Sequence, residues 1–281
     1  MEFYDRGGEV EIIGLSDFDL VKIFECGQCF RWNADTSGEY IGVALDHVAR
    51  LRRSGDSIFI SGSMEDFEKI WFDYLDLDRD YAEIRQQLCI DAFMQKATEF
   101  GAGIRILRQD KWEALCSFII SQCNNIPRIK KIIATLCQEF GSKIDFDGKT
   151  YYTFPSAQAL AALEVSALAP LRCGYRAEYI IGAAKAISDE TLDLEALSKT
   201  TEDEARKKLK KLNGVGDKVA DCAILYGLNM LDSFPKDTWI KKAITNHYGK
   251  GFDPKIFTPY AGIAQQYIFY YTRNEKTLAI N

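Results

Sequence analysis

The residues best suited to chemistry lie in the segment LKKLNGVGDKVADCAILYGL, residues 209–228. Lys218 follows the glycine-rich turn NGVG, and we expect it in the first turn of a helix that begins near Asp217. The partial positive charge at a helix N-terminus disfavours a cation there and favours the neutral amine, which is the nucleophilic form. A lysine placed against this local preference is a candidate nucleophile.

Asp237 comes about twenty residues later, in SFPKDTWIKKAI, directly before another stretch of apolar-periodic helix. Considered alone, it fits the role of a helix N-cap as well as it fits a functional role. In a functional role, its carboxylate would lie near the amine of Lys218 and stabilise positive charge that develops there during a reaction.

The turn between these helices has a second possible function. Gly214 and Gly216 allow backbone conformations with positive φ, so the sequence predicts a helix that ends at Leu212, a tight hairpin and a second helix. The backbone N–H groups of Gly214, Val215 and Gly216 would point at one spot and could hold a phosphate without reading any base. The alternative is an ordinary helical turn in which the glycines only cap a helix.

The rest of the chain predicts an α+β protein. The first sixty residues alternate like strands of an antiparallel sheet, in EVEIIG, CFRWNAD, YIGVALD, HVARLRR and SIFISG. From about residue 64 the apolar period shifts towards that of helices, and residues 142–158 read as a loop between helices. We therefore expect an N-terminal antiparallel α/β domain over residues 1–100 and a helical domain over residues 101–281, with the helix-hairpin-helix at about 203–228.

Composition restricts the class of protein. The net charge of −6 argues at first against a nucleic-acid partner, but residues 1–100 carry 10 Lys and Arg against 21 Asp and Glu, whereas residues 101–281 carry 25 against 20. The second part could therefore face DNA. No apolar stretch approaches the ~20 residues that span a bilayer, and the acidic start is unlike a signal peptide. We expect a cytoplasmic protein.

The eight cysteines indicate a reducing compartment. Only Cys26 and Cys29 are closely spaced, as C-x-x-C, so a thiol redox pair is one hypothesis for this segment. No second pair completes a zinc site, and the remaining cysteines are too scattered for an iron-sulfur cluster. The sequence predicts no metal site and no cofactor.

At this point the chain resembles a known family. LNGVGDKVADC followed by FPKDTW resembles the helix-hairpin-helix DNA glycosylases, which have a Gly/Pro-rich loop and a catalytic Asp. Further blocks resemble the 8-oxoguanine DNA glycosylases, in the expected order: GQCFRW at 27–32, SQCNNIPRIKKI at 121–132, GYRAEYI at 174–180 and AGIAQQYIF at 261–269. The resemblance covers almost the whole chain and implies a TATA-binding-protein-like fold for the N-terminal sheet.

The resemblance also implies roles for individual residues. Lys218 would attack C1′ of the damaged nucleotide and form a Schiff base with help from Asp237, which makes the enzyme both a glycosylase and a β-lyase. The flipped base would lie between Cys222 and Phe269, and the Gly27 carbonyl would read its N7 hydrogen. The pocket would be completed by Pro235 and Gln265.

The resemblance further implies contacts to double-stranded DNA that contains 8-oxoguanine. The opposite strand and its estranged cytosine would be held by Cys123, Asn124, Arg128, Tyr175 and Arg176. Two positions depart from the family pattern: Cys123 replaces the first asparagine of a run, and Trp239 replaces a histidine near the 5′ phosphate. Because of Cys123 we expect weaker selectivity for cytosine, whereas at Trp239 stacking or packing would replace a phosphate contact. The hairpin carbonyls could hold a monovalent cation, and we expect a monomer.

Three other functions remain open at this stage. A glycosylase for alkylated purines is one, although such enzymes often lack the hairpin lysine. A DNA-binding module without chemistry would use the hairpin for phosphate and Lys218 only as a basic residue. A thiol oxidoreductase would act through the CGQC segment.

Overall fold

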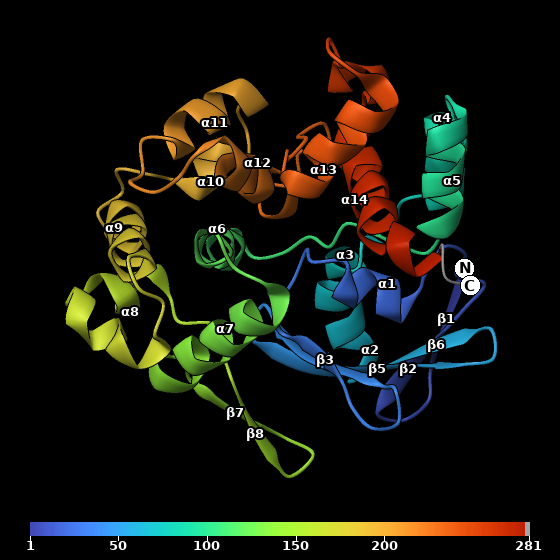
Figure 1. Ribbon diagram of the computed structural model, residues 1–281. Coiled ribbons are helices and arrows are strands. Elements are labelled where there is room, and N and C mark those ends of the chain that lie inside the picture. Colours follow the sequence, from blue (N-terminus) through green and yellow to red (C-terminus); the bar gives the residue numbers. More distant parts are fainter. Residues whose placement is uncertain (279–281) are drawn as a thin grey trace.

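The computed structural model describes residues 1–278, and Figure 1 shows a sheet at the N-terminal end of the chain beside a larger group of helices. The sheet is antiparallel and six-stranded, with the strand order β1-β2-β6-β5-β4-β3. Its strands are β1 (Glu2–Asp5), β2 (Glu9–Ile13), β3 (Trp32–Ala34), β4 (Tyr40–Ala44), β5 (His47–Ser54) and β6 (Ser57–Ser61).

Alternation along the strands explains the sheet. In β2 and β6 every second side chain is buried, and the register pairs Val10 with Ile60. The apolar face is covered by α1 (Leu20–Glu25), α2 (Met64–Asp66), a π-helical turn (Phe67–Trp71) and α3 (Phe72–Tyr74). The predicted antiparallel sheet is confirmed, whereas β1 and α1 were not predicted and only residues 32–34 of CFRWNAD form a strand.

The predicted helical part is also confirmed. Its helices are α4 (Tyr81–Leu88), α5 (Ala92–Phe100), α6 (Lys111–Ile120), α7 (Ile126–Phe140), α8 (Ala157–Ala161), α9 (Arg176–Ser188), α10 (Leu194–Leu197), α11 (Glu202–Leu209), α12 (Asp217–Tyr226), α13 (Thr238–Ala243) and α14 (Ala261–Leu278). Short helical turns lie at η2 (Val165–Leu171), η3 (Ile244–Tyr248) and η4 (Pro254–Phe257). The almost wholly buried α6 packs against α7, α9 and α12, so it forms the centre of this part.

One segment differs from its prediction. The stretch predicted as a loop contains a hairpin, formed by β7 (Lys143–Phe146) and β8 (Lys149–Tyr152). Its turn is Asp147-Gly148, with φ of 50° and 68°. Two positive φ values are typical of the two-residue turn whose twist matches that of paired strands, and an Asp-Gly pair adopts them readily.

The structure contains two hydrophobic cores, one under the sheet and one within the helices. α4 and α5 contribute to the helical core, where α5 packs against α14. The boundary at residue 100 stays a prediction. Over the part of the chain that the structure describes, no helix has the length and apolar character needed to cross a membrane.

Candidate active site

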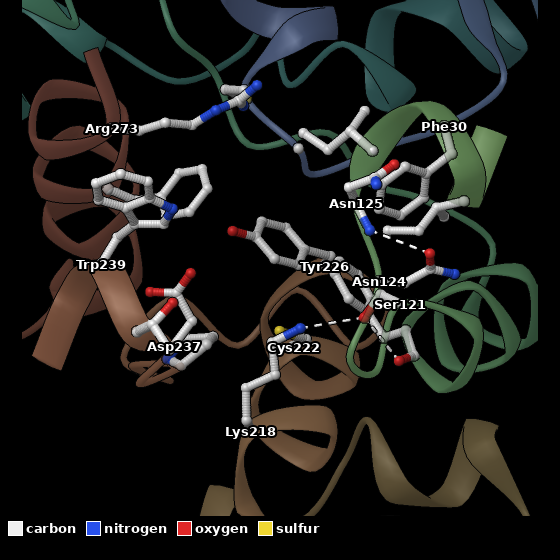
Figure 2. Close-up of a pocket in the computed structure, with 18 of the residues that line it drawn as sticks. Phe30, Ser121, Asn124, Asn125, Lys218, Cys222, Tyr226, Asp237, Trp239 and Arg273 are labelled. Atoms are coloured by element: carbon white, nitrogen blue, oxygen red, sulfur yellow. Dashed lines mark hydrogen bonds between the residues drawn. The ribbon is translucent and has the colours of Figure 1, made fainter. Parts of the chain in front are cut away.

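A cavity of about 360 Å³ opens where α12, α14 and the start of α13 meet the loop after α1 (Figure 2). Residues predicted from distant parts of the sequence line this one cavity: Gly27, Asn124, Lys218, Cys222, Pro235, Asp237, Gln265 and Phe269. The fold therefore brings together the candidate nucleophile, the candidate carboxylate and the predicted base pocket.

Lys218 lies in the first turn of α12, and its amine points into the cavity (Figure 2). The Nζ donates to the hydroxyl of Ser121 at 3.1 Å and lies 5.4 Å from the centre of the Phe118 ring. The amine is thus held by one hydroxyl and one aromatic face rather than by a carboxylate. This arrangement leaves it available to an electrophile that enters the cavity.

Asp237 both caps a helix and lines the cavity. It is the N-cap of α13, where its Oδ1 accepts a hydrogen bond from the N–H of Ile240 at 2.8 Å. Burial raises the pKa of the Asp237 carboxyl above its ordinary value of 3.8, while the Ile240 N–H and the charge of Lys218 act in the opposite direction. The carboxylate therefore lies in a partly dry cavity where its charge interacts with the amine.

Gly27 is the one predicted pocket residue whose type follows from its backbone. It adopts φ +84°, in the left-handed region that favours glycine. A Cβ at this position would meet Phe269 at 3.7 Å and Ile126 at 3.4 Å, which is ordinary contact. The positive φ of the backbone, rather than a lack of room for a side chain, therefore favours glycine at position 27.

The side chains that would face the base are apolar or uncharged. Burial raises the pKa of Cys222 to about 12, so its thiol is neutral and suits packing rather than nucleophilic attack. Gln265 is buried and lines the cavity. Trp239 also lines the cavity, and its ring lies 5.9 Å from the Nζ of Lys242.

The residues predicted for the opposite strand gather in a second cluster beside the cavity. Cys123 is exposed with φ +47°, and Tyr175 is 52% exposed. Arg176 is buried beneath them, and its guanidinium donates to the carbonyls of Gln122 and Cys123. Arg128 is exposed and donates to the carbonyl of Arg172 at 3.3 Å. Arg176 thus supports the loop, whereas Tyr175 and Arg128 remain accessible to a ligand.

The hairpin differs in detail from its prediction. α11 ends at Leu209, not Leu212, because bonds between residues three apart tighten the chain after it. Gly214 has φ +80°, and a Cβ there would lie 2.2 Å from the Tyr179 ring. Gly216 has φ −90°, so the expectation of positive φ is wrong for this residue. The start of α12 at Asp217 is as predicted.

Several cavity residues were missed in the sequence, among them Phe118, Ser121, Tyr226, Gln266 and Arg273. The first two lie on buried α6 and immediately after it, where no periodic signal separates them from core residues. Tyr226 did carry a signal. Residues 218, 222 and 226 are spaced by four along one helix and therefore share a face.

The thiol hypothesis for Cys26 and Cys29 gains no support. Both side chains are buried, and burial raises the pKa of Cys26 to about 12 and that of Cys29 well above its ordinary value. Redox thiols need the opposite shift. Among residues 1–278, no group of three or more His, Cys, Asp or Glu side chains is placed to hold a metal ion.

Comparison with known proteins defines the class of this fold and site. Residues 116–255 match the HhH-GPD superfamily of base excision DNA repair proteins. Residues 12–115 match the model described as 8-oxoguanine DNA glycosylase, N-terminal domain. The helical part, which carries the helix-hairpin-helix and Lys218, thus belongs to a superfamily of base excision DNA repair proteins.

Relatives narrow this class to one family. An N-glycosylase/DNA lyase of Saccharomyces cerevisiae is 30% identical over 84% of this chain and 70% of its own length. The N-glycosylase/DNA lyase OGG1 of Arabidopsis thaliana is 31% identical over 90% of this chain and 77% of its own. The chain belongs to the 8-oxoguanine DNA glycosylase/lyase family.

Solved structures agree with this assignment. MBOgg1 in complex with a low-affinity DNA ligand is 44% identical, with a TM-score of 0.94 over 98% of this chain and 99% of that one. The 8-oxoguanine glycosylase/lyase of Clostridium acetobutylicum, in complex with duplex DNA containing cytosine opposite 8-oxoG, is 37% identical, with a TM-score of 0.93 over 98% and 99% of the two chains.

Proposed function

We propose that this chain excises 8-oxoguanine from double-stranded DNA and then cleaves the strand by β-elimination. One observation carries the proposal: the amine of Lys218 and the carboxylate of Asp237 line a single cavity, next to the Gly27 turn. Because C1′ of a stacked nucleotide is out of reach, the damaged nucleotide must leave the helix and enter this cavity.

The residues then divide the chemistry between them. The Lys218 amine attacks C1′, the bond to the base breaks with its electron pair going to the base, and the base takes up a proton. Asp237 stabilises the positive charge that builds on the sugar during this step. The sugar ring then opens, as the C1′–O4′ bond breaks and O4′ takes up a proton, which leaves a Schiff base between Lys218 and C1′. Loss of a C2′ proton then expels the 3′ phosphate.

Recognition of the lesion is assigned to the pocket. Guanine presents N7 as an acceptor, whereas 8-oxoguanine carries a hydrogen there. A backbone carbonyl at Gly27 would accept this hydrogen, and Gln265 would bind the Watson–Crick edge. Cys222 and Phe269 would cover the two faces of the base, with Pro235 at the edge of the pocket.

The contacts to DNA are proposed outside the cavity. The N–H groups of residues 214–216 would hold a phosphate. Tyr175 would fill the space of the extruded nucleotide, and Arg128 would pair with the estranged cytosine, supported by Arg176 and the 123–124 loop. All predicted pocket residues come from one chain, so we propose that a monomer acts on the duplex. The monovalent cation at the hairpin stays a prediction.

Borohydride trapping tests the proposal. Incubation of the protein with an 8-oxoguanine duplex and borohydride should give a covalent complex on a denaturing gel, because a lysine Schiff base is reduced to a stable amine. Lys218→Gln should abolish the complex and retain binding to the lesion duplex. Lys69→Gln is the matched control, since it removes one exposed amine from the sheet part of the chain. Trapping that survives Lys218→Gln would place the nucleophile elsewhere.

The same experiment separates the other functions. A DNA-binding module would bind the duplex and give no complex or cleavage. A thiol oxidoreductase would lose its activity in Cys26→Ser, a substitution that should not affect trapping.

A further inference from the structure

The turn that contains Gly27 is held on both sides by glutamine amides, that of the buried Gln266 and that of the half-buried Gln109. Nε2 of Gln266, in α14, donates to the carbonyl of Cys26 at 3.0 Å. Nε2 of Gln109 donates to the carbonyl of Gln28 at 2.8 Å. The carbonyls before and after that of Gly27 are therefore fixed by side chains from two distant segments.

Gln28 strengthens this restraint. Its side chain is fully buried and bonds the carbonyls of Ile23 and Arg105 as well as the N–H of Leu107. Within the described residues 1–278, no hydrogen bond reaches the carbonyl of Gly27 itself. The surrounding bonds thus hold this carbonyl in place and leave it without an internal partner.

Tyr226 is hydrogen-bonded to the amide of Gln266. Its hydroxyl donates to Oε1 of Gln266 and lies 3.4 Å from Oε1 of Gln265. Tyr226 is 4% exposed and Gln266 is 1% exposed. Burial raises the pKa of Tyr226 well above its ordinary value, so the hydroxyl keeps its proton and serves as a donor.

These contacts permit only one orientation of the Gln266 amide. The Tyr226 hydroxyl meets Oε1, and the Cys26 carbonyl requires an N–H donor at Nε2. The reversed amide would set Oε1 against the carbonyl oxygen of Cys26. Removal of the hydroxyl leaves a buried acceptor without its partner and weakens the constraint on the carbonyl next to Gly27.

Tyr226 also connects the turn to the nucleophile. It lies on the same face of α12 as Lys218, two helical turns further along. Its ring stacks on Phe118 at 5.2 Å and 19°, and the Lys218 amine lies over the Phe118 ring. One helix therefore carries both the attacking amine and the support of the base-reading turn (Figure 2).

We propose that Tyr226 is a positioning residue for lesion recognition: acting through Gln266 and the Cys26 carbonyl, it fixes the Gly27 carbonyl where the N7 hydrogen of the extruded base meets it. This inference rests on the proposed function. It goes beyond that function in assigning lesion discrimination to a tyrosine and a glutamine that need not touch the N7 edge.

The test uses Tyr226→Phe, which keeps the ring and its stacking and removes only the hydroxyl. The single-turnover rate of 8-oxoguanine excision at subsaturating enzyme should fall by roughly 5- to 30-fold, since a buried hydrogen bond to the supporting amide is lost. Cleavage and borohydride trapping at a preformed abasic site should be unchanged, because no base is read there. Gln266→Met, of similar volume, should show the same pattern.

The double variant makes the test specific. If Tyr226 acts through Gln266, Tyr226→Phe should reduce the excision rate little further when Gln266→Met is already present. Tyr248→Phe is the matched control, because it removes a tyrosine hydrogen bond to Asp91 between two residues that do not line the cavity, and it should leave both activities unchanged. Thermal unfolding of each variant checks that the fold is retained.

The outcomes separate this inference from the function on which it rests. Equal loss of abasic-site cleavage, an unchanged excision rate, or losses that multiply in the double variant would each overturn the positioning role. If Tyr226→Phe does not fold, the rates of 8-oxoguanine excision and abasic-site cleavage by Gln266→Met test the positioning role instead. A wild-type protein that cleaves abasic sites and leaves 8-oxoguanine in place would instead overturn the proposed function.

Discussion

Asp237 offers the sharpest test of the catalytic assignment, because one carboxylate caps a helix and faces the nucleophile. Its Oδ1 accepts the Ile240 N–H at 2.8 Å, and its charge interacts with Lys218 in a half-buried position. Asp237→Asn keeps an oxygen for the cap and removes the charge, whereas Asp237→Ala removes both. The two substitutions therefore separate the structural role from the chemical one.

The magnitudes differ for the two roles. Loss of the cap in Asp237→Ala should lower the free energy of unfolding by about 1 kcal/mol, and Asp237→Asn should lower it by a few tenths, since Asn is a good cap. Loss of a charge that stabilises the transition state should slow excision by roughly 10²- to 10³-fold in both variants. Lesion binding should change much less than the rate, because the positive charge develops only as the base leaves.

The assay is single-turnover excision from an 8-oxoguanine duplex at saturating enzyme, with thermal or urea unfolding of the same preparations. We expect equal rate losses in the two variants and unequal stabilities. An Asn variant that excises at the wild-type rate beside a slow Ala variant would refute the reasoning, since the effect would then arise from the cap alone.

Three further predictions concern pH, lesion preference and the opposite base. Because burial raises the pKa of Asp237 above 3.8, its carboxylate is protonated at a higher pH than that of an exposed Asp. The excision rate should therefore fall as the pH drops through this raised pKa. If the same fall in rate at low pH persists in Asp237→Asn, the titrating group is a residue other than Asp237. Alanine in Gly27→Ala must adopt φ +84°, which costs an L-residue roughly 1–2 kcal/mol. The ratio of the excision rate of 8-oxoguanine to that of guanine should decrease in Gly27→Ala, whereas Gln265→Ala should weaken the binding of both bases. An unchanged ratio in Gly27→Ala would locate lesion recognition at other residues. Arg128→Ala should reduce the preference for cytosine over adenine opposite the lesion, measured as the ratio of the two excision rates. The midpoint of thermal unfolding should change little, because the side chain is exposed. An unchanged ratio would show that Arg128 does not contact the opposite base.

Local patterns in the sequence were sufficient to predict the classes of element and to select Lys218 and Asp237 as candidate site residues. The alternation in β2 and β6 defined the sheet, and the glycine turn before Asp217 defined the start of α12. Lys218 and Asp237 could be selected because each lies at a helix start, where charge and capping preferences depend on the neighbouring residues. The β7–β8 hairpin was missed although its Asp-Gly turn is equally local, because its strands are only four residues long.

Contacts between residues that are far apart in the sequence were determined by the tertiary structure alone. No pattern in the chain shows that Lys218 donates to Ser121 across 97 positions, or that Gln266 bonds the carbonyl of Cys26 across 240. Arg176, predicted as a DNA contact, proved to be buried under the loop of Cys123. A sequence specifies local preferences residue by residue, whereas burial and the partner of each buried polar group depend on which segments the completed core brings together.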